Sequence, residues 1–315
     1  MIAWLVLLQA SLTIAVAGPI TSPEYLPLHV AQAEGHFTAQ HLAVTLRPMR
    51  SDAGAAEALA LGQAQLAATS LDTALRLGHV DGVPPRLVWG LTAAAPVALL
   101  VNPARAESIR SAADLVRQTV AVPAPGTAED QTLGLLLARA GVPFNRITLR
   151  SLGERGAARA LESGEVAAAV LAEPYASRLV AEGKAVVAVD LRTAAAAAAA
   201  LGGPTVNAAL FARAGALPEP ATLRALAAAL QVAVARVTGS EPGALAAGLP
   251  DAVIGSPADF AARLQSARDL FLPGGRVSVE ALEHSLALVR SRAPLPTRVK
   301  VPKRVEQLLV EPAGG

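Results

Sequence analysis

The chain has 315 residues, of which 53% are hydrophobic and 17% are charged, with a net charge of +2. This length can bury two hydrophobic cores of ordinary domain size, and 27 basic against 25 acidic residues argue against a basic face for nucleic acid. The chain has no cysteine, which excludes disulfides, thiolate catalysis, Cys-ligated metals and a lipid-modified N-terminal cysteine.

The first ten residues, MIAWLVLLQA, form an apolar run with no basic residue before it. Such a run resembles the hydrophobic region of a secretory signal that has lost its charged start, and it is also compatible with an apolar first strand. It is too short to span a bilayer, which takes about 20 residues. We therefore treat 1–10 as a possible signal-peptide remnant and expect the folded part to begin near residue 11.

Strand-like and helix-like patterns then alternate along the chain. Such alternation predicts an α/β fold with mainly parallel sheets covered by helices on both faces. The first series has strands at 12–18, 43–49, 66–69 and 86–91, with helices at 23–35 and 54–62. The second has strands at 119–123, 146–152, 167–171 and 185–191, with helices at 127–140, 156–164 and 174–183.

Two segments 102 residues apart are similar: GAAEALALG at 54–62 and GAARALESG at 156–164. Each occupies the same place in its series, which predicts two lobes of similar topology. The apolar segments 97–101 and 205–211 lie between the series, and we expect them to be crossover strands joining the lobes. The prediction is a first lobe of 11–98 and 206–315, containing helices after about residue 218, and a second lobe of 99–205.

The ligand site of such a fold is expected in the loops beyond the carboxyl ends of the strands. Both tyrosines of the chain, Tyr25 and Tyr175, fall in these loops, one in each predicted lobe, and an aromatic ring with a polar tip suits a small-ligand cleft. Thr127 and Asp130 have the spacing of a helix cap, and Gly126 before them permits an unusual backbone angle. This helix start could present free N–H groups to a ligand or could be an ordinary cap.

Signals for catalysis or metal binding are weak. The sequence has no phosphate-binding loop, no GxGxxG after a strand, no GxSxG and no HExxH motif. The five histidines do not line up on one helix face, and carboxylates in the candidate loops are explained by helix N-termini as readily as by acid–base roles. We expect no metal, no cofactor and no catalytic residue.

Several stretches together resemble the nitrate/sulfonate/taurine family of solute-binding proteins of ABC importers. The stretch YLPLHVAQAEGHFTAQHLAVTL at 25–46 resembles the family's first helix and second strand, which read roughly hVAxxxGFFxxxGLxV. The similarity continues through 54–72, the crossover at 91–102, DLVRQTVAVPAPGT at 114–127 and AEPYASRLVAEG at 172–183, and it covers about 12–295. It departs from the family pattern at His41, where Gly is usual, and at Gln65, where Asp is usual.

The resemblance implies a type II periplasmic-binding-protein fold whose cleft closes on a small molecule. It implies an extracytoplasmic monomer that delivers its ligand to a membrane permease and ATPase complex and binds no nucleic acid. The candidate loops carry acids but almost no Lys or Arg, so the ligand could be an oxyanion held by backbone N–H groups or a small heterocycle. An enzyme of the same fold, of the thiamine-pyrimidine or menaquinone-pathway type, is the alternative. The expected ligand contacts are Ser22, Tyr25, Thr69, Ser70, Thr92, Gly126, Thr127, Glu173, Tyr175 and Asn207.

Overall fold

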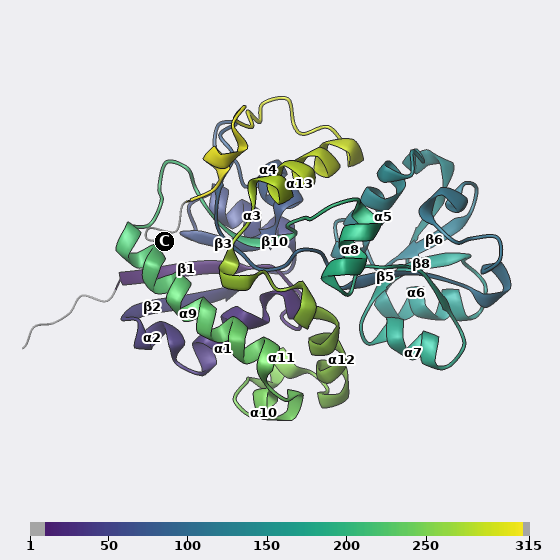
Figure 1. Cartoon of the computed structure of the whole chain (residues 1–315), viewed down its shortest axis with the longest axis horizontal. Helices are drawn as coiled ribbons and strands as arrows, with labels where there is room; N and C mark the ends of the chain where they lie inside the picture. The colour runs from purple at the N-terminus through teal and green to yellow at the C-terminus, as the bar shows by residue number, and fades with distance from the viewer. Residues whose placement is uncertain (1–9, 311–315) are drawn as a thin grey trace, which may run out of the picture.

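The computed structural model describes residues 10–310, which form two α/β lobes side by side (Figure 1). The possible signal remnant at 1–10 lies outside these residues except for Ala10, where the first strand begins. Each lobe has one five-stranded sheet, with strand order β2-β1-β3-β10-β4 in the first lobe and β7-β6-β8-β5-β9 in the second. The predicted two-lobed α/β fold is therefore confirmed.

The two sheets have the same topology. β1 (Ala10–Val16) pairs in parallel with β2 (Leu42–Pro48) and β3 (Leu66–Ser70), as β6 (Thr119–Val122) does with β7 (Thr148–Ser151) and β8 (Ala168–Ala172). In each lobe the next strand is antiparallel to both of its neighbours. In the first lobe β10 (Ala208–Ala212) lies between β3 and β4 (Arg86–Gly90), and in the second β5 (Val97–Val101) lies between β8 and β9 (Val186–Asp190).

The antiparallel inner strands are the two predicted crossovers. β5 begins seven residues after β4 ends and belongs to the second sheet, whereas β10 returns to the first sheet after β9. All five residues of β5 and all five of β10 are buried, as expected for strands covered on both faces. The predicted boundary between residues 98 and 99 falls inside β5. The division into a first lobe of 11–98 plus 206–315 and a second lobe of 99–205 stays a prediction.

The similar segments found in the sequence form equivalent helices. α3 (Asp52–Ala60) precedes β3, and α6 (Gly153–Glu162) precedes β8. The glycine after each helix, Gly62 or Gly164, has a positive φ of 71° or 77°, which suits the residue that ends a helix. The same local sequence therefore makes the same helix end before the same strand in both lobes.

Helices cover both faces of the sheets (Figure 1). In the first lobe they are α1 (Leu26–Ala33), α2 (His36–Ala39), α3, α4 (Leu71–Leu77), α9 (Pro220–Gly239), α10 (Pro242–Ala246), α11 (Asp251–Ile254) and α12 (Pro257–Ala267). In the second lobe they are α5 (Ala128–Arg139), α6, α7 (Tyr175–Ala181) and α8 (Ala194–Leu201). Short 3-10 turns include η1 (Pro23–Tyr25) after β1 and η5 (Arg268–Leu270) after α12.

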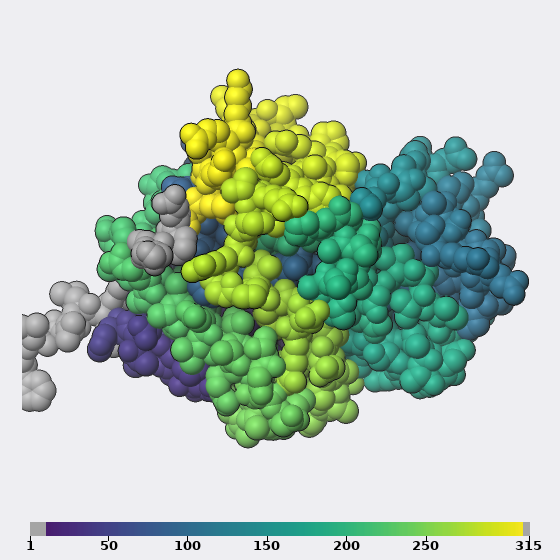
Figure 2. All heavy atoms as spheres, viewed as in Figure 1, coloured from purple at the N-terminus to yellow at the C-terminus, as the bar shows by residue number. Residues whose placement is uncertain are grey.

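Two helices have special positions. α9 is long and apolar enough to span a membrane, but it packs against α1 and α2 and buries Leu226, Leu230 and Val237 in the first lobe's core. α13 (Val279–Arg292) packs against α5 of the second lobe as well as α4 of the first. Figure 2 shows this C-terminal part of the chain, in yellow, lying over the first lobe and reaching the second. α13 therefore packs on the first lobe, with Leu282, Leu286 and Val289 in its core, and contacts the second lobe as well.

Candidate functional site

A cavity of about 700 Å³ lies between the two lobes. Its walls come from the segments that follow the parallel strands β1, β2, β6 and β8, together with residues of α6, α7 and α12. This is the location expected for a ligand in an open parallel sheet, beyond the carboxyl ends of the strands. Both lobes contribute, so a molecule in the cavity would contact both at once.

Six of the ten predicted contact residues line this cavity and four lie beneath its wall. The lining six are Ser22, Tyr25, Gly126, Thr127, Glu173 and Tyr175. The other four, Thr69, Ser70, Thr92 and Asn207, do not line it. Thr69, Ser70 and Thr92 are buried, and all four hold other side chains of the site by hydrogen bonds. Their role in this structure is to position the cavity wall.

Glu24 is the most enclosed acid of the wall, with only 6% of its surface exposed. Its Oε1 accepts hydrogen bonds from Asn207 Nδ2 at 2.6 Å and from Thr92 Oγ1 at 3.2 Å. Its Oε2 has no hydrogen-bond partner within residues 10–310. Burial, and next the charge of Asp52, raise the pKa of Glu24 to about 8.

Asp52, the first residue of α3, is likewise held through only one of its two carboxylate oxygens. Its Oδ1 accepts hydrogen bonds from Tyr25 Oη at 3.0 Å, Thr69 Oγ1 at 3.0 Å and the Ser70 backbone N–H at 2.8 Å. Its other oxygen, Oδ2, accepts no hydrogen bond from another residue of 10–310. Burial raises the pKa of Asp52, although these three donors act in the opposite direction.

Glu129 brings a third acid from the second lobe, in the first turn of α5. That helix begins as the sequence predicts: Thr127 Oγ1 accepts from the Asp130 N–H at 3.4 Å, and Gly126 has a φ of 77°. Asp130 Oδ2 accepts from the Gly126 N–H at 2.9 Å rather than from the cap residue itself. Burial raises the pKa of Glu129 as well.

The two tyrosines come from opposite lobes, as expected, but their environments differ. Tyr25 is only 3% exposed and belongs to the first lobe's core. Burial, and next the negative charge of Asp52, raise the pKa of its phenol. Tyr175 is half-buried, and the Arg178 guanidinium lies 5.6 Å from its ring centre. Both tyrosines line the cavity, Tyr25 as a buried part of the wall and Tyr175 as a half-buried one.

Glu173 lines the cavity, but its carboxylate is fully engaged within the second lobe. Oε2 accepts from the Ser177 N–H at 3.0 Å, and Oε1 accepts from Ser177 Oγ at 2.7 Å and Arg192 Nη1 at 2.6 Å. This acid has its counter-charge in Arg192, whereas no basic residue of 10–310 forms an ion pair with Glu24 or Asp52.

Five arginines line the cavity, although the candidate loops themselves carry almost no Lys or Arg, as the sequence shows. They lie mostly outside the strand–helix loops: Arg50, Arg155, Arg159, Arg178 and Arg263. Arg50, Arg155 and Arg159 are exposed, and Arg178 forms an ion pair of 3.3 Å with Asp259 of the other lobe. The sequence signal was the i,i+4 spacing of Arg155 and Arg159, which places both on one face of α6. Arg50, Arg155, Arg159 and Arg178 are thus exposed at the rim, whereas Arg263 is half-buried and donates to the Ile254 carbonyl at 2.6 Å.

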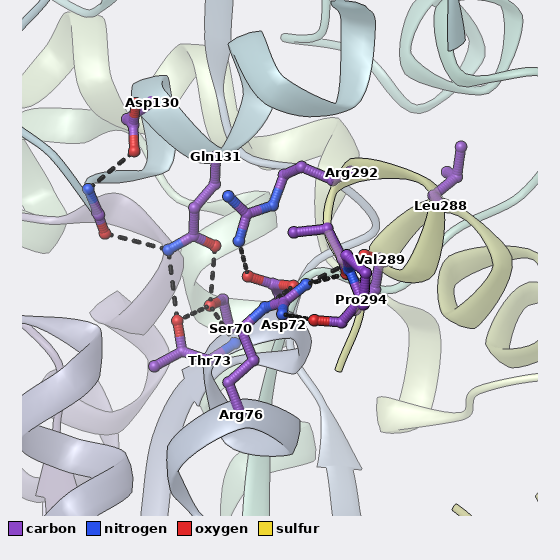
Figure 3. A network of polar contacts seen from close by, with 12 residues as sticks. Ser70, Asp72, Thr73, Arg76, Asp130, Gln131, Leu288, Val289, Arg292 and Pro294 are labelled. Carbon is purple, nitrogen blue, oxygen red and sulfur yellow. Dashed lines mark hydrogen bonds and ion pairs between the residues drawn. The ribbon is translucent and has the colours of Figure 1, made fainter. Parts of the chain in front are cut away.

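Behind the cavity the lobes are joined by a polar network (Figure 3). Gln131 of α5 accepts from Ser70 Oγ at 3.1 Å and donates to Thr73 Oγ1 at 3.3 Å and to the Gly126 carbonyl at 3.0 Å. Nearby, Asp72 accepts hydrogen bonds from both Arg76 and Arg292. Ser70 thus connects the Asp52 position with the second lobe.

The family profile described as NMT1/THI5 like matches residues 22–238, more than half of the chain. The chain belongs to the NMT1/THI5-like family. No curated protein matches the sequence significantly.

Solved structures share the fold of this NMT1/THI5-like protein across nearly its whole length. The alkanesulfonate-binding protein SsuA of Xanthomonas axonopodis pv. citri, bound to MOPS, is 20% identical with a TM-score of 0.65, covering 96% of this chain and 98% of that one. Periplasmic aliphatic sulphonate-binding SsuA of Escherichia coli is 19% identical with a TM-score of 0.67, covering 90% of each chain. A protein of Bordetella bronchiseptica RB50 is 22% identical with a TM-score of 0.75, covering 96% and 94%. These similarities establish the periplasmic-binding-protein fold.

Proposed function

We propose that this protein is the solute-binding component of an ABC importer, capturing a small molecule in the cavity between its lobes. The observation that carries the proposal is the cavity of about 700 Å³, whose wall is shared between two lobes joined by two crossover strands. A ligand bound to both lobes stabilises the closed arrangement over an open one. The sulfonate-binding and nitrate-binding proteins with the same fold support this role.

The proposed role implies further partners and a location. The loaded protein would dock on a membrane permease and its ATPase, and it would work as an extracytoplasmic monomer without a cofactor. Of its predicted contacts, Ser22, Tyr25, Gly126, Thr127, Glu173 and Tyr175 line the cavity. They are the positions from which we expect direct contacts.

Thermal unfolding in the presence of small solutes tests the proposal. The panel would contain alkanesulfonates, nitrate, taurine, amines and aminopyrimidines. A ligand that binds only the native state at 100 times its Kd adds about 2.7 kcal/mol to the unfolding free energy, which raises the Tm. The bound compound should be recovered unchanged by mass spectrometry. No stabilisation by any member, or conversion of the bound compound, would contradict a transport-binding role.

An enzyme of the same fold is the second candidate, favoured by one observation. A carboxyl whose pKa is raised to about 8, as in Glu24, could serve as a general acid or base near neutral pH. No histidine of residues 10–310 lines the cavity beside it. Product formation in the mass-spectrometric assay, lost in Glu24→Gln, would favour this candidate.

A further inference from the structure

The interior of the cavity holds three acids without a basic partner. Glu24, Asp52 and Glu129 all line it, and no Lys, Arg or His in the described part of the chain forms an ion pair or hydrogen bond with any of them. Buried carboxylates are ordinarily paired, because removing an unpaired charge from water is costly. Such a carboxyl either holds a proton, which the raised pKa of Glu24 describes, or takes its counter-charge from a bound molecule, since residues 10–310 supply none.

Glu24 and Asp52 are also held in a common geometry. Each has one oxygen anchored, by Asn207 and Thr92 for Glu24 and by three donors for Asp52. The second oxygen of each accepts no hydrogen bond from another described residue, although only 6% of Glu24 is exposed. Anchoring fixes both carboxyl groups, so once a cation favours their charged forms the free oxygens are preorganised acceptors in the cavity wall.

A metal ion does not fit this cluster. Within the residues that the structure describes, no group of three or more His, Cys, Asp or Glu side chains lies close enough to hold one. A partner for these carboxyl groups should therefore be a larger, positively charged group with several N–H donors. An organic ammonium or amidinium satisfies this, because each presents two or more donors with a positive charge.

The charges at the rim do not supply the missing partner. Arg178 pairs with Asp259, while exposed Arg155 and Arg159 lie on α6 with the cavity-lining acids Glu154 and Glu162 of the same helix. Exposed charges are screened by solvent and salt, so they act weakly on a group in the interior. Half-buried Arg263 also lines the cavity, but it donates to the Ile254 carbonyl and forms no ion pair with Glu24, Asp52 or Glu129 within residues 10–310.

We propose that the ligand of this cavity carries a positively charged nitrogen group, an amine or an amidine, which binds the free oxygens of Glu24 and Asp52. The inference rests on the proposed solute-binding function and narrows its ligand class away from simple oxyanions. Glu129 faces the same space from the second lobe, so a cationic group would draw the lobes together. Such charge-assisted hydrogen bonds are the stronger kind.

Two matched series of probes test the ligand class by calorimetric titration. One is benzamidine, benzamide and benzenesulfonate; the other is butylamine, butanol and butanesulfonate. Within each series the shape is nearly constant while the charge goes from positive to neutral to negative. We expect the cation to bind at least about tenfold more tightly than its neutral counterpart, the effect of one charge-assisted hydrogen bond.

Four variants locate the effect. The Glu24→Gln and Asp52→Asn changes keep shape and remove charge, and the double variant should lose the preference for the cation. Glu107→Gln removes the same charge from an exposed position outside the cavity and should keep that preference. Circular dichroism verifies that each variant folds.

The outcomes separate this inference from the proposed function. Tighter binding of the sulfonates, equal binding within each series, or a cation preference that survives the double variant would overturn the inference while leaving a solute-binding protein. Failure of all six probes at 10 mM would also overturn it. The proposed function itself fails only if the broader solute panel gives no bound and unchanged compound.

Discussion

Glu24 couples the protein's stability to pH. Its pKa in the folded protein is raised from 4.5 to about 8 by burial and by Asp52, so the folded state holds a proton that the unfolded chain releases. The stabilisation is fully present below about pH 4.5 and is lost as pH rises towards 8. The unfolding free energy should fall across this window with a slope of up to about 1.4 kcal/mol per pH unit from this residue.

Glu24→Gln should flatten that slope, because the amide cannot ionise. Urea unfolding between pH 5 and pH 9 measures this slope. The unfolding free energy of the variant should rise relative to that of the wild type as the pH approaches 9. Some slope should remain, since burial raises the pKa of Asp52 and of Glu129 in the same direction. Exposed Glu107→Gln is the control and should parallel the wild type. A slope in Glu24→Gln equal to that of the wild type would show that the buried acid does not titrate as described.

The sequence locates the site at the level of loops but not of single side chains. Tyr25, Gly126 and Tyr175 follow parallel strands and line the cavity. Thr69 and Thr92 also lie at strand ends, yet their hydroxyls turn inward to Asp52 and Glu24. A strand alternates its side chains between two faces, and which face meets the ligand depends on packing that local sequence does not specify.

The end of α13 depends on one side chain from α4. Arg76 donates to the carbonyls of Val289 at 3.1 Å, Ala293 at 2.7 Å and Pro294 at 2.8 Å, and its Nε donates to Asp72 at 2.8 Å. The last carbonyls of a helix have no partner within the helix, so this guanidinium satisfies groups that would otherwise need water (Figure 3).

Arg76→Met should therefore loosen α13 from the lobe junction. Keeping the apolar stem while removing the donors should cost about 1.5–3 kcal/mol, the range for hydrogen bonds to a charged group. Chemical unfolding measures the loss, and hydrogen exchange should show faster exchange in α13 than in α9. Arg105→Met, at an exposed arginine away from the junction, serves as the matched control. Equal stability of both variants would mean that Arg76 does not hold the helix.

Most elements could be predicted from periodicity, and the exceptions have a physical cause. The predicted strand at 97–101 coincides with β5, and the similar segments at 54–62 and 156–164 correspond to α3 and α6. α4 was not predicted, because it follows β3 without a loop and both are buried. Ser70 is both the last residue of the strand and the N-cap of the helix, so no Gly or Pro separates the two elements.

The two lobes touch on either side of the cavity through contacts of different strength. Behind it, buried Gln131 bonds to Ser70 and Thr73. In front, Arg178 and Asp259 pair across the opening with 51% and 34% of their side chains exposed, so that pair contributes about 0–1 kcal/mol. The front contact is therefore easier to break than the buried rear contact. Closing the cavity then depends mainly on what the ligand contributes.

A saturating ligand should accordingly shift the protein towards a more compact form, which small-angle X-ray scattering detects as a smaller radius of gyration. The physical reason is that a molecule touching both walls binds the closed arrangement more tightly and moves the population by that difference in affinity. Asp259→Asn should change the radius of the ligand-bound protein little, because the front ion pair is weak. Gln131→Ala should alter the radius even without ligand, because it removes the buried link between the lobes. Identical scattering with and without a ligand that binds in the cavity would show that the lobes do not move, and the two-lobed structure would then act as a rigid receptor.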